Sequence, residues 1–292
     1  GGLNERKSIT IILVPELVEG RLNRIRITME RTYRLVVSCP DRTGIVAKVS
    51  NFLATYNGWI TEASYHADQK NGWFFMRNEI KASSIPFSVE DFKTAFQPIA
   101  KEYSMNWSIS DSDTKKRVVL MVSKESHCLA DLLHRWHSKE LDAEIVAVIS
   151  NHDDLRRMVE WHDIPYHHVP VDPKDKAPAF AEVNRLVETY QTDLVVLARY
   201  MQILPAEICE QYSGRVINIH HSFLPSFAGA KPYHQAYDRG VKLIGATCHY
   251  VTQDLDEGPI IDQDVIRISH SDAIEDMVRL GKDVEKMVLS RG

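Results

Sequence analysis

The sequence predicts an α/β protein of two domains. The chain has 292 residues, of which 44% are hydrophobic and 26% are charged, and this is enough to bury two substantial cores. Its first part reads as strands and helices in the order βαββαβ. Its second part alternates apolar strands with helical patterns, which is typical of a parallel sheet covered by helices on both faces.

The first domain is predicted to have a ferredoxin-like fold. We expect strands at residues 33–38, 59–67, 73–80 and 105–110, and helices at 44–56 and 88–103. Asn71 and Gly72 lie between two alternating apolar segments, which is a strong signal for a β-hairpin. Ser88, with Asp91 three residues later, marks a helix start. Together these elements make a ferredoxin-like βαββαβ unit.

The second domain follows a polar linker at residues 111–116. We expect strands at 117–122, 144–149, 166–169, 193–197, 215–219, 242–251 and 259–268, and helices at 128–137, 154–161, 177–190, near 233–239 and from about 271. The apolar runs before Asn218 and after Gly258 both read as strands buried on both faces. The pattern predicts a doubly wound, mostly parallel, Rossmann-like sheet.

These patterns divide the chain into three predicted segments. They are an extension over residues 1–30, to which we assign no function, a first domain over 31–112 and a second over 113–292. The net charge of −5 gives no reason to expect nucleic acid or an anionic membrane as a partner. Apolar runs such as 118–122 are too short to span a bilayer, and no secretory signal is recognisable, so a cytoplasmic location is expected.

No metal site is expected. The four cysteines are scattered without a C-x-x-C pair, and they are predicted to be reduced thiols in or near the core. Among the thirteen histidines, His134 and His137 share a predicted helix face, but no acidic third ligand accompanies them.

The most informative motif is Asn-x-His-x-Ser-x-Leu-Pro at residues 218–225, followed by Leu-Asp-x-Gly-Pro at 255–259. An Asn amide can donate a hydrogen bond to a developing oxyanion, and a His can exchange a proton with the reacting group. A nearby carboxylate can orient and charge that His. Since active sites of open α/β sheets lie at strand ends, we expect Asn218, His220 and Asp256 to emerge there.

This pair of motifs resembles the signature of the folate-dependent formyltransferase and hydrolase family. From about Arg31 onward the chain resembles the hydrolases of that family, which convert 10-formyltetrahydrofolate and water into tetrahydrofolate and formate. The resemblance implies that Asn218, His220 and Asp256 are catalytic, that the folate is the substrate and that no cofactor is bound permanently. It also implies direct attack by water, with Ser222 as a hydrogen-bonding residue of the loop rather than a nucleophile.

The resemblance further implies a binding loop for the pterin ring after the strand at 193–197. The predicted substrate-binding residues are Arg199, Met201, Gln202, Ile203 and Leu204, together with His249. Leu204 is equally compatible with ordinary core packing. The segment 227–233 is expected to border the formyl group.

The turn at residues 39–46 resembles that of ACT domains, small regulatory modules that bind amino acids. The resemblance implies that Asp41, Arg42, Thr43 and Gly44 hold an amino-acid effector, methionine or glycine. Exposed sheet edges in such a unit favour a homo-oligomer. An alternative without any ligand has Asp41 capping the helix and Gly44 letting the chain turn.

Two other functions stay open. A folate-dependent formyltransferase would pass the formyl group to an amine such as glycinamide ribonucleotide, and its first strand-to-helix turn is glycine-rich and cradles a phosphate. Here that turn, residues 123–128, contains no glycine, and Glu125 would repel a phosphate. The second alternative is a non-catalytic regulator that binds folate or an amino acid. The intact set of Asn218, His220 and Asp256 argues against it.

Overall fold

The computed structural model describes residues 30–226 and 231–292, which form two compact units that divide between Thr114 and Lys115. Each unit has its own hydrophobic core, as expected of a domain. Residues 1–29 of the predicted extension lie outside the described residues. The same holds for residues 227–230, which include most of the segment expected to border the formyl group.

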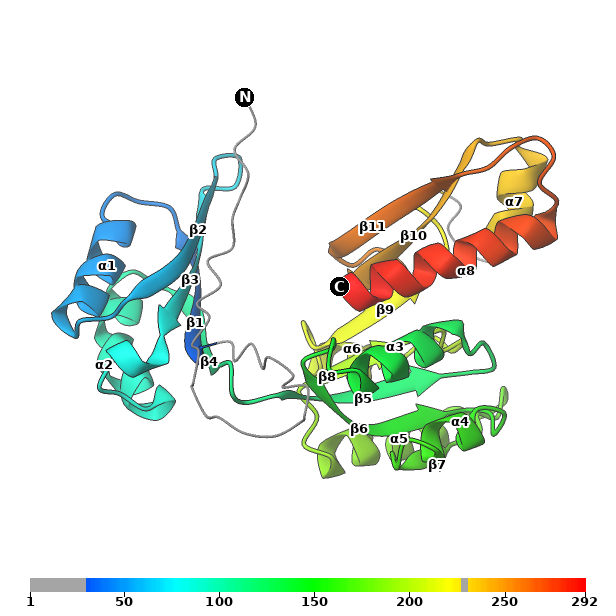
Figure 1. Ribbon diagram of the computed structural model, residues 1–292, viewed down its shortest axis with the longest axis horizontal. Helices are drawn as coiled ribbons and strands as arrows, with labels where there is room; N and C mark the ends of the chain where they lie inside the picture. The colour runs from blue at the N-terminus through cyan, green and yellow to red at the C-terminus, as the bar shows by residue number, and fades with distance from the viewer. Residues whose placement is uncertain (1–29, 227–230) are drawn as a thin grey trace, which may run out of the picture. The chain divides into compact units, whose positions relative to one another are not determined.

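The N-terminal unit is an antiparallel sheet of four strands with two helices. Its elements are β1 (Thr32–Pro40), α1 (Ile45–Thr55), β2 (Ile60–Asp68), β3 (Trp73–Lys81), the 3-10 helix η1 (Ala82–Ser84), α2 (Val89–Glu102) and β4 (Asn106–Asp111). The strand order is β2-β3-β1-β4, and all three pairings are antiparallel. Alternate residues of β1 and β3 are buried in one core with residues of α1 and α2. This confirms the predicted ferredoxin-like order (Figure 1).

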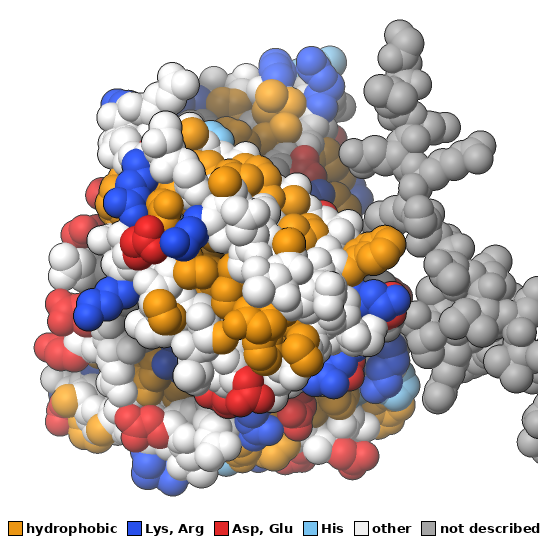
Figure 2. All heavy atoms as spheres, turned by 90° about the vertical axis from the view of Figure 1, so that its left-hand side faces the viewer, with side chains coloured by type: hydrophobic (Ala, Val, Ile, Leu, Met, Phe, Trp, Pro, Cys, Tyr) orange, Lys and Arg blue, Asp and Glu red, His pale blue; other side chains and the backbone are white. Residues whose placement is uncertain are grey.

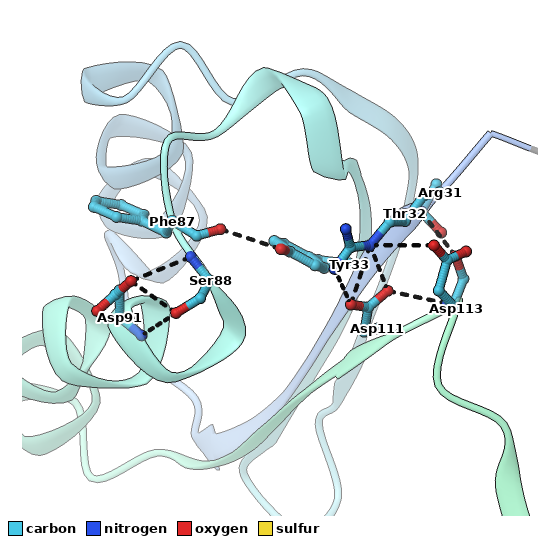
Figure 3. Close-up of polar contacts among 9 residues, drawn as sticks. Arg31, Thr32, Tyr33, Phe87, Ser88, Asp91, Asp111 and Asp113 are labelled. Carbon is cyan, nitrogen blue, oxygen red and sulfur yellow. Dashed lines mark hydrogen bonds and ion pairs between the residues drawn. The ribbon is translucent and has the colours of Figure 1, made fainter.

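Polar contacts fix the start of α2 and join the two ends of this unit (Figure 3). The Ser88 hydroxyl accepts a hydrogen bond from the Asp91 N–H at 3.2 Å, and the Asp91 carboxylate accepts one from the Ser88 N–H at 3.3 Å. This capping box begins α2 as predicted. Arg31 Nε donates to Asp111 Oδ1 at 3.0 Å, so residues beside the first and last strands are joined.

The predicted hairpin joins β2 to β3, and Gly72 adopts a left-handed conformation with φ of 67°. The start of α1 tests the alternative without a ligand, in which Asp41 caps the helix and Gly44 lets the chain turn. Gly44 is the N-cap, with φ of 94°, and no side chain caps the helix. The expectation that Asp41 caps α1 is therefore wrong, because that residue lies before the N-cap and its N–H bonds to the Gly72 carbonyl at 2.8 Å.

The second unit is built on a sheet of seven strands. Its elements are β5 (Lys116–Val122), α3 (His127–His137), β6 (Ala143–Ser150), α4 (Arg156–Glu160), β7 (Tyr166–His168), α5 (Ala177–Thr189), β8 (Leu194–Leu197), α6 (Ala206–Gln211), β9 (Val216–His220), α7 (Pro232–Asp238), β10 (Leu243–Tyr250), β11 (Ile260–Arg267) and α8 (Ile274–Arg291). The strand order is β11-β10-β9-β8-β5-β6-β7. Pairings from β9 to β7 are parallel, whereas β10 runs antiparallel to both β9 and β11.

Helices cover both faces of this sheet, as a doubly wound fold requires. Residues of α3, α4 and α8 share one core with alternate residues of the strands, such as Leu120. Residues of α5 and α6 share a second core with the intervening strand residues, such as Met121. The mostly parallel, doubly wound prediction is therefore confirmed. Helix α6 was not predicted, because its six residues are too few to show a clear period.

The strand after Gly258 differs from expectation. It was predicted to be buried on both faces, but β11 lies at the sheet edge and pairs only with β10. Its residues are exposed or half-buried. An apolar run at an edge strand reads like a central one in sequence, because the composition alone does not show how many neighbours a strand has.

All four cysteines are buried and free, as expected of core thiols. Within the described ranges, no helix combines the length and apolar character that crossing a bilayer requires.

Candidate active site

The change from parallel to antiparallel pairing at β9 places the polar residues of the main motif. Asn218 pairs with Leu197 of β8 on one side and with His249 of β10 on the other. His220 is the last residue of β9 and is buried. Asn218 thus lies inside the strand rather than beyond its end, which corrects the expectation for this residue.

Asp256 reaches the same place from the loop between β10 and β11. This residue has φ of 59°, a left-handed backbone conformation that few residues other than glycine, asparagine and aspartate adopt. The loop returns tightly to the sheet, since the Tyr250 N–H bonds to the Pro259 carbonyl at 2.9 Å. A Cβ at Gly258 would stand 1.7 Å from the Tyr250 carbonyl oxygen, so only glycine fits there.

The side chains of these segments form one contact group. His220 Nδ1 lies 3.3 Å from Asp256 Oδ1, and His249 Nε2 lies 3.7 Å from the same oxygen. Burial would raise the pKa of the Asp256 carboxyl, but the imidazoles of His220 and His249 hold it well below its usual range. The carboxylate is therefore ionised, and it is able to orient the His220 ring.

The other ring nitrogen of His220 stays available. His220 Nε2 is buried and has no hydrogen-bond partner among the residues that the structure describes. A buried polar atom of this kind normally meets a ligand or water. With Nδ1 directed at Asp256, Nε2 is the atom that is able to exchange a proton with a substrate.

His249 determines how the Asn218 amide is used. His249 Nδ1 lies 2.9 Å from the Tyr250 carbonyl, which only accepts, so Nδ1 carries the hydrogen. His249 Nε2 lies 3.3 Å from Asn218 Nδ2 and 3.7 Å from Asp256 Oδ1, so the ring stands between the amide and the carboxylate. The Asn218 amide nitrogen carries two N–H groups, and the one that does not face His249 is left for a substrate oxygen.

These residues line a cavity of about 630 Å³, within the range of small-molecule sites. Every predicted substrate-binding residue lines it too: Arg199, Met201, Gln202, Ile203, Leu204 and His249. Met201 and Ile203 expose 56% and 61% of their surface, so neither is a core residue. Leu204 is buried within the core under α5 and α6 and also reaches the cavity wall.

Known proteins are similar to this chain in sequence and in fold. A family model described as formyl transferase matches residues 116–292. The formyltetrahydrofolate deformylase of Bacillus subtilis (strain 168) is 46% identical over 272 residues, which cover 93% of this chain and 91% of the relative. The chain belongs to the formyltetrahydrofolate deformylase family.

Solved structures agree with membership of the deformylase family. A crystal structure of a formyltetrahydrofolate deformylase from Pseudomonas syringae pv. tomato is 72% identical, with a TM-score of 0.90, over 91% of this chain and 89% of that one. A phosphoribosylglycinamide formyltransferase from Bacillus halodurans is 31% identical, with a TM-score of 0.57, over 60% of this chain and 92% of that one.

The sequence analysis missed a buried ionic cluster in the same cavity wall of this deformylase-family chain. Glu285 of α8 accepts hydrogen bonds from His127 Nε2 at 2.7 Å and from the Tyr233 hydroxyl at 2.6 Å, and its Oε2 lies 3.5 Å from Arg199 Nε. No local signal shows this cluster, because 158 residues separate His127 from Glu285. Only the acidic residue on the apolar face of the last helix gives a hint.

Part of this cluster also has the composition of a metal site. His127, Cys128 and Glu285 offer ligand atoms within 4.8 Å of one another, whereas the sequence predicted no metal site. Burial raises the pKa of the Cys128 thiol, which disfavours the thiolate that a metal would need. Arg199 already supplies a positive charge to Glu285. We therefore interpret the group as an ion-pair network.

Of two residues in the neighbouring loops, Glu125 has surroundings different from those predicted, and Ser222 makes the loop hydrogen bond that was expected. Glu125 was expected to repel a phosphate, but its carboxylate pairs with Lys282 Nζ at 2.6 Å. Lys282 lowers the pKa of that carboxyl, and its charge offsets much of the repulsion. The Ser222 hydroxyl donates to the Ser226 carbonyl at 2.8 Å, so it is held within its loop.

The predicted effector residues Asp41, Arg42, Thr43 and Gly44 form an exposed turn of the N-terminal unit. The side chain of Arg42 makes two contacts. One of its terminal nitrogens donates to the Glu102 carbonyl at 2.7 Å, and its guanidinium lies over the Tyr103 ring at 3.8 Å. The turn is thereby tied to the C-terminal end of α2.

Proposed function

We propose that this protein hydrolyses 10-formyltetrahydrofolate to tetrahydrofolate and formate by direct attack of water. The observation that carries this proposal is the meeting of Asn218, His220 and Asp256 in one cavity, with no hydrogen-bond partner for His220 Nε2 among residues 30–226 and 231–292. The apolar side chains of Met201 and Ile203 on the same cavity suit a flat ring. Relatives of this chain are named formyltetrahydrofolate deformylase, a name that describes the proposed reaction.

The reaction needs one bond to form and one to break. The water oxygen bonds to the formyl carbon, and the formyl oxygen takes up negative charge as the carbon becomes tetrahedral. The bond from that carbon to N10 of the folate then breaks, and N10 takes a proton. Formate and tetrahydrofolate leave, so every atom of water ends in a product.

Each of the three polar residues has a proposed role in that sequence. Asn218 donates its remaining N–H to the oxyanion, an interaction whose loss costs ~10²–10³ in rate. His220, held by Asp256, shares this stabilisation and moves the proton, a contribution of about 10²–10⁴. Asp256 lies 3.3 Å from His220 and also orients the water.

Transfer of the formyl group to an amine is the competing reaction. The turn that would cradle a nucleotide phosphate, residues 123–128, has no glycine, which supports hydrolysis. Because Glu125 is paired with Lys282, the missing glycines are a stronger argument than the charge of Glu125.

The deciding experiment follows the labelled formyl carbon. Purified protein is incubated with 10-formyltetrahydrofolate, with and without glycinamide ribonucleotide. Label in formate under both conditions is the expected result. Label that moves mainly onto the ribonucleotide would replace hydrolysis with transfer.

For the N-terminal unit we propose an ACT-like regulatory role over residues 31–112, with the formyltransferase-like catalytic domain over 113–292. The exposed turn with Asp41, Arg42, Thr43 and Gly44 is the proposed site for methionine or glycine. Calorimetry with both amino acids tests it. Heat of binding that disappears in Arg42→Ala is expected, and no heat with either amino acid would remove the regulatory role.

We also propose that this unit assembles the protein into a homo-oligomer. The helical side of the unit, which faces the viewer in Figure 2, mixes hydrophobic with polar and charged side chains. On the opposite side of its sheet, Val36 of β1 and Phe75 of β3 expose 41% and 44% of their surface. A sheet face with exposed apolar side chains, next to the open edge of β2, suits pairing with a second copy.

A further inference from the structure

Arg199 has an unusual position for a cation. Its side chain is only 13% exposed, and its backbone has φ of 67°, a conformation that strains any residue with a Cβ. Its Nε is buried and has no hydrogen-bond partner in the described part of the chain. Buried guanidinium groups normally satisfy their donors, so this one calls for a ligand.

Glu285 holds Arg199 without satisfying it. The closest approach of the two groups is the 3.5 Å from Nε to Oε2, so the terminal nitrogens lie further away. Both oxygens of Glu285 are already engaged, one by Tyr233 and the other by His127. Burial would raise the pKa of the Glu285 carboxyl, but His127, Arg199 and Tyr233 hold it below its usual value.

The chain makes room for this cluster. A Cβ at Gly281 of α8 would stand 2.0 Å from the Tyr233 hydroxyl, so glycine lets that hydroxyl reach Glu285. The resulting contacts join α3, α7, α8 and the loop after β8. These contacts fix the Glu285 carboxylate beside the Arg199 guanidinium, so the group that orients Arg199 is preorganised.

Arg199 lines the cavity that Asn218, His220 and Asp256 also line. After burial, the charge of Arg199 is the next largest reason why the pKa of His221 falls to about 4, so the cation acts on the end of β9. A planar fork of N–H donors matches a carboxylate, and hydrolysis of a formyl group leaves the smallest carboxylate, formate.

We propose that Arg199, held by Glu285, forms a subsite for the product formate. The inference rests on the proposed function, since only hydrolysis produces formate in this cavity. Arg199 binds the carboxylate, and Glu285 is a positioning residue that acts through Arg199. The folate substrate has carboxylates of its own in its glutamate tail, and the test has to separate the two sources.

Direct binding of ¹³C-formate, followed by NMR in the absence of folate, is the primary measurement. Three heavy atoms limit the Kd of formate to about the millimolar range. Arg199→Gln is expected to weaken binding by roughly 10-fold or more, because a charge-assisted pair is lost. Gln has a Cβ as Arg does, so the backbone strain is unchanged. Arg199→Lys keeps the charge without the fork and is expected to fall between the two.

Lys282→Gln is the matched control, since Lys282 is another cation of the same cavity wall but is paired with Glu125. Its formate affinity is expected to equal that of the wild type. Glu285→Gln is expected to weaken formate binding in the wild-type background and to have no further effect in Arg199→Gln, because it acts through Arg199. Circular dichroism checks that each variant folds. If Arg199→Gln does not fold, Arg199→Lys is used in its place.

Several results would overturn the subsite. They are no formate binding by the wild type, unchanged binding in Arg199→Gln, or an equal loss in Lys282→Gln. A higher KM for 10-formyltetrahydrofolate in Arg199→Gln with unchanged formate affinity would assign Arg199 to the glutamate tail instead. Hydrolysis is measured separately. If the protein binds formate but does not hydrolyse the folate, the subsite stands and the proposed function is wrong. If it hydrolyses the folate but does not bind formate, the proposed function stands and the subsite is wrong.

Discussion

Replacing Gly258 by alanine tests whether the loop after β10 positions Asp256. The added Cβ would stand 1.7 Å from the Tyr250 carbonyl oxygen, and ordinary contact begins at 3.4 Å. The obstacle is backbone that belongs to a sheet strand, so the loop has to yield rather than a flexible side chain. A shift of about 1.7 Å, the difference between those distances, follows for the residues next to Gly258.

That shift is large compared with the contact it disturbs. Asp256 lies two residues before Gly258, and its carboxylate is 3.3 Å from His220 Nδ1. A misplacement on the order of 1 Å costs about 10²-fold in rate. We therefore expect kcat/KM of Gly258→Ala to fall by about 10²-fold.

Formate release at several folate concentrations measures this fall. Gly214→Ala is the control, because Gly214 has φ of 70° with no atom within 4 Å of its added Cβ. It should lose about 1–2 kcal/mol of stability through backbone strain and keep its kinetics. Wild-type kcat/KM in Gly258→Ala, or an equal fall in Gly214→Ala, would refute the reasoning.

Three further predictions concern other parts of the molecule. Asp256→Asn and His220→Ala should each lower kcat by about 10²–10⁴, and Asn218→Ala should lower it by about 10²–10³. Folate affinity should change less in all three variants. Near-wild-type turnover in any variant would show that its residue takes no part in the chemistry. Burial and the charge of Arg199 lower the pKa of His221 from 6.5 to about 4, so the neutral form stabilises the fold above pH 6.5 and this contribution is lost as pH falls towards 4. Denaturant titrations should show that His221→Gln flattens this decline, and an unchanged pH profile would contradict it. Phe75→Glu should dissociate the proposed homo-oligomer in analytical ultracentrifugation, and unchanged mass would exclude that sheet face.

Much of the fold was predictable because its signals are local. The capping box at Ser88 and the hairpin at Gly72 are each encoded within a few residues, and the structure has both. The strands of the second unit appear as apolar runs between helical patterns. The motif at 218–225 also named residues that the structure brings into one cavity with Asp256.

What could not be predicted depends on contacts between distant segments. The approach of Glu285 to His127 and Arg199 follows from how α8 packs on the sheet and on α3. The edge position of β11 depends on pairing order, which composition does not contain. His249 was expected to touch the substrate, and its contact with Asn218 arises only from strand register.

The register between β9 and β10 is itself a determinant of catalysis. Side chains alternate between the faces of a sheet, so a slip of one residue would place Cys248 or Tyr250 opposite Asn218 and turn His249 to the other face. The register between β10 and β11 shifts between Cys248 and His249, and His249 is the residue that pairs with Asn218. A single-residue insertion or deletion in β10 would therefore take His249 away from the Asn218 amide. For anyone redesigning this fold, the length of β10 is as much an active-site parameter as the identity of any catalytic side chain.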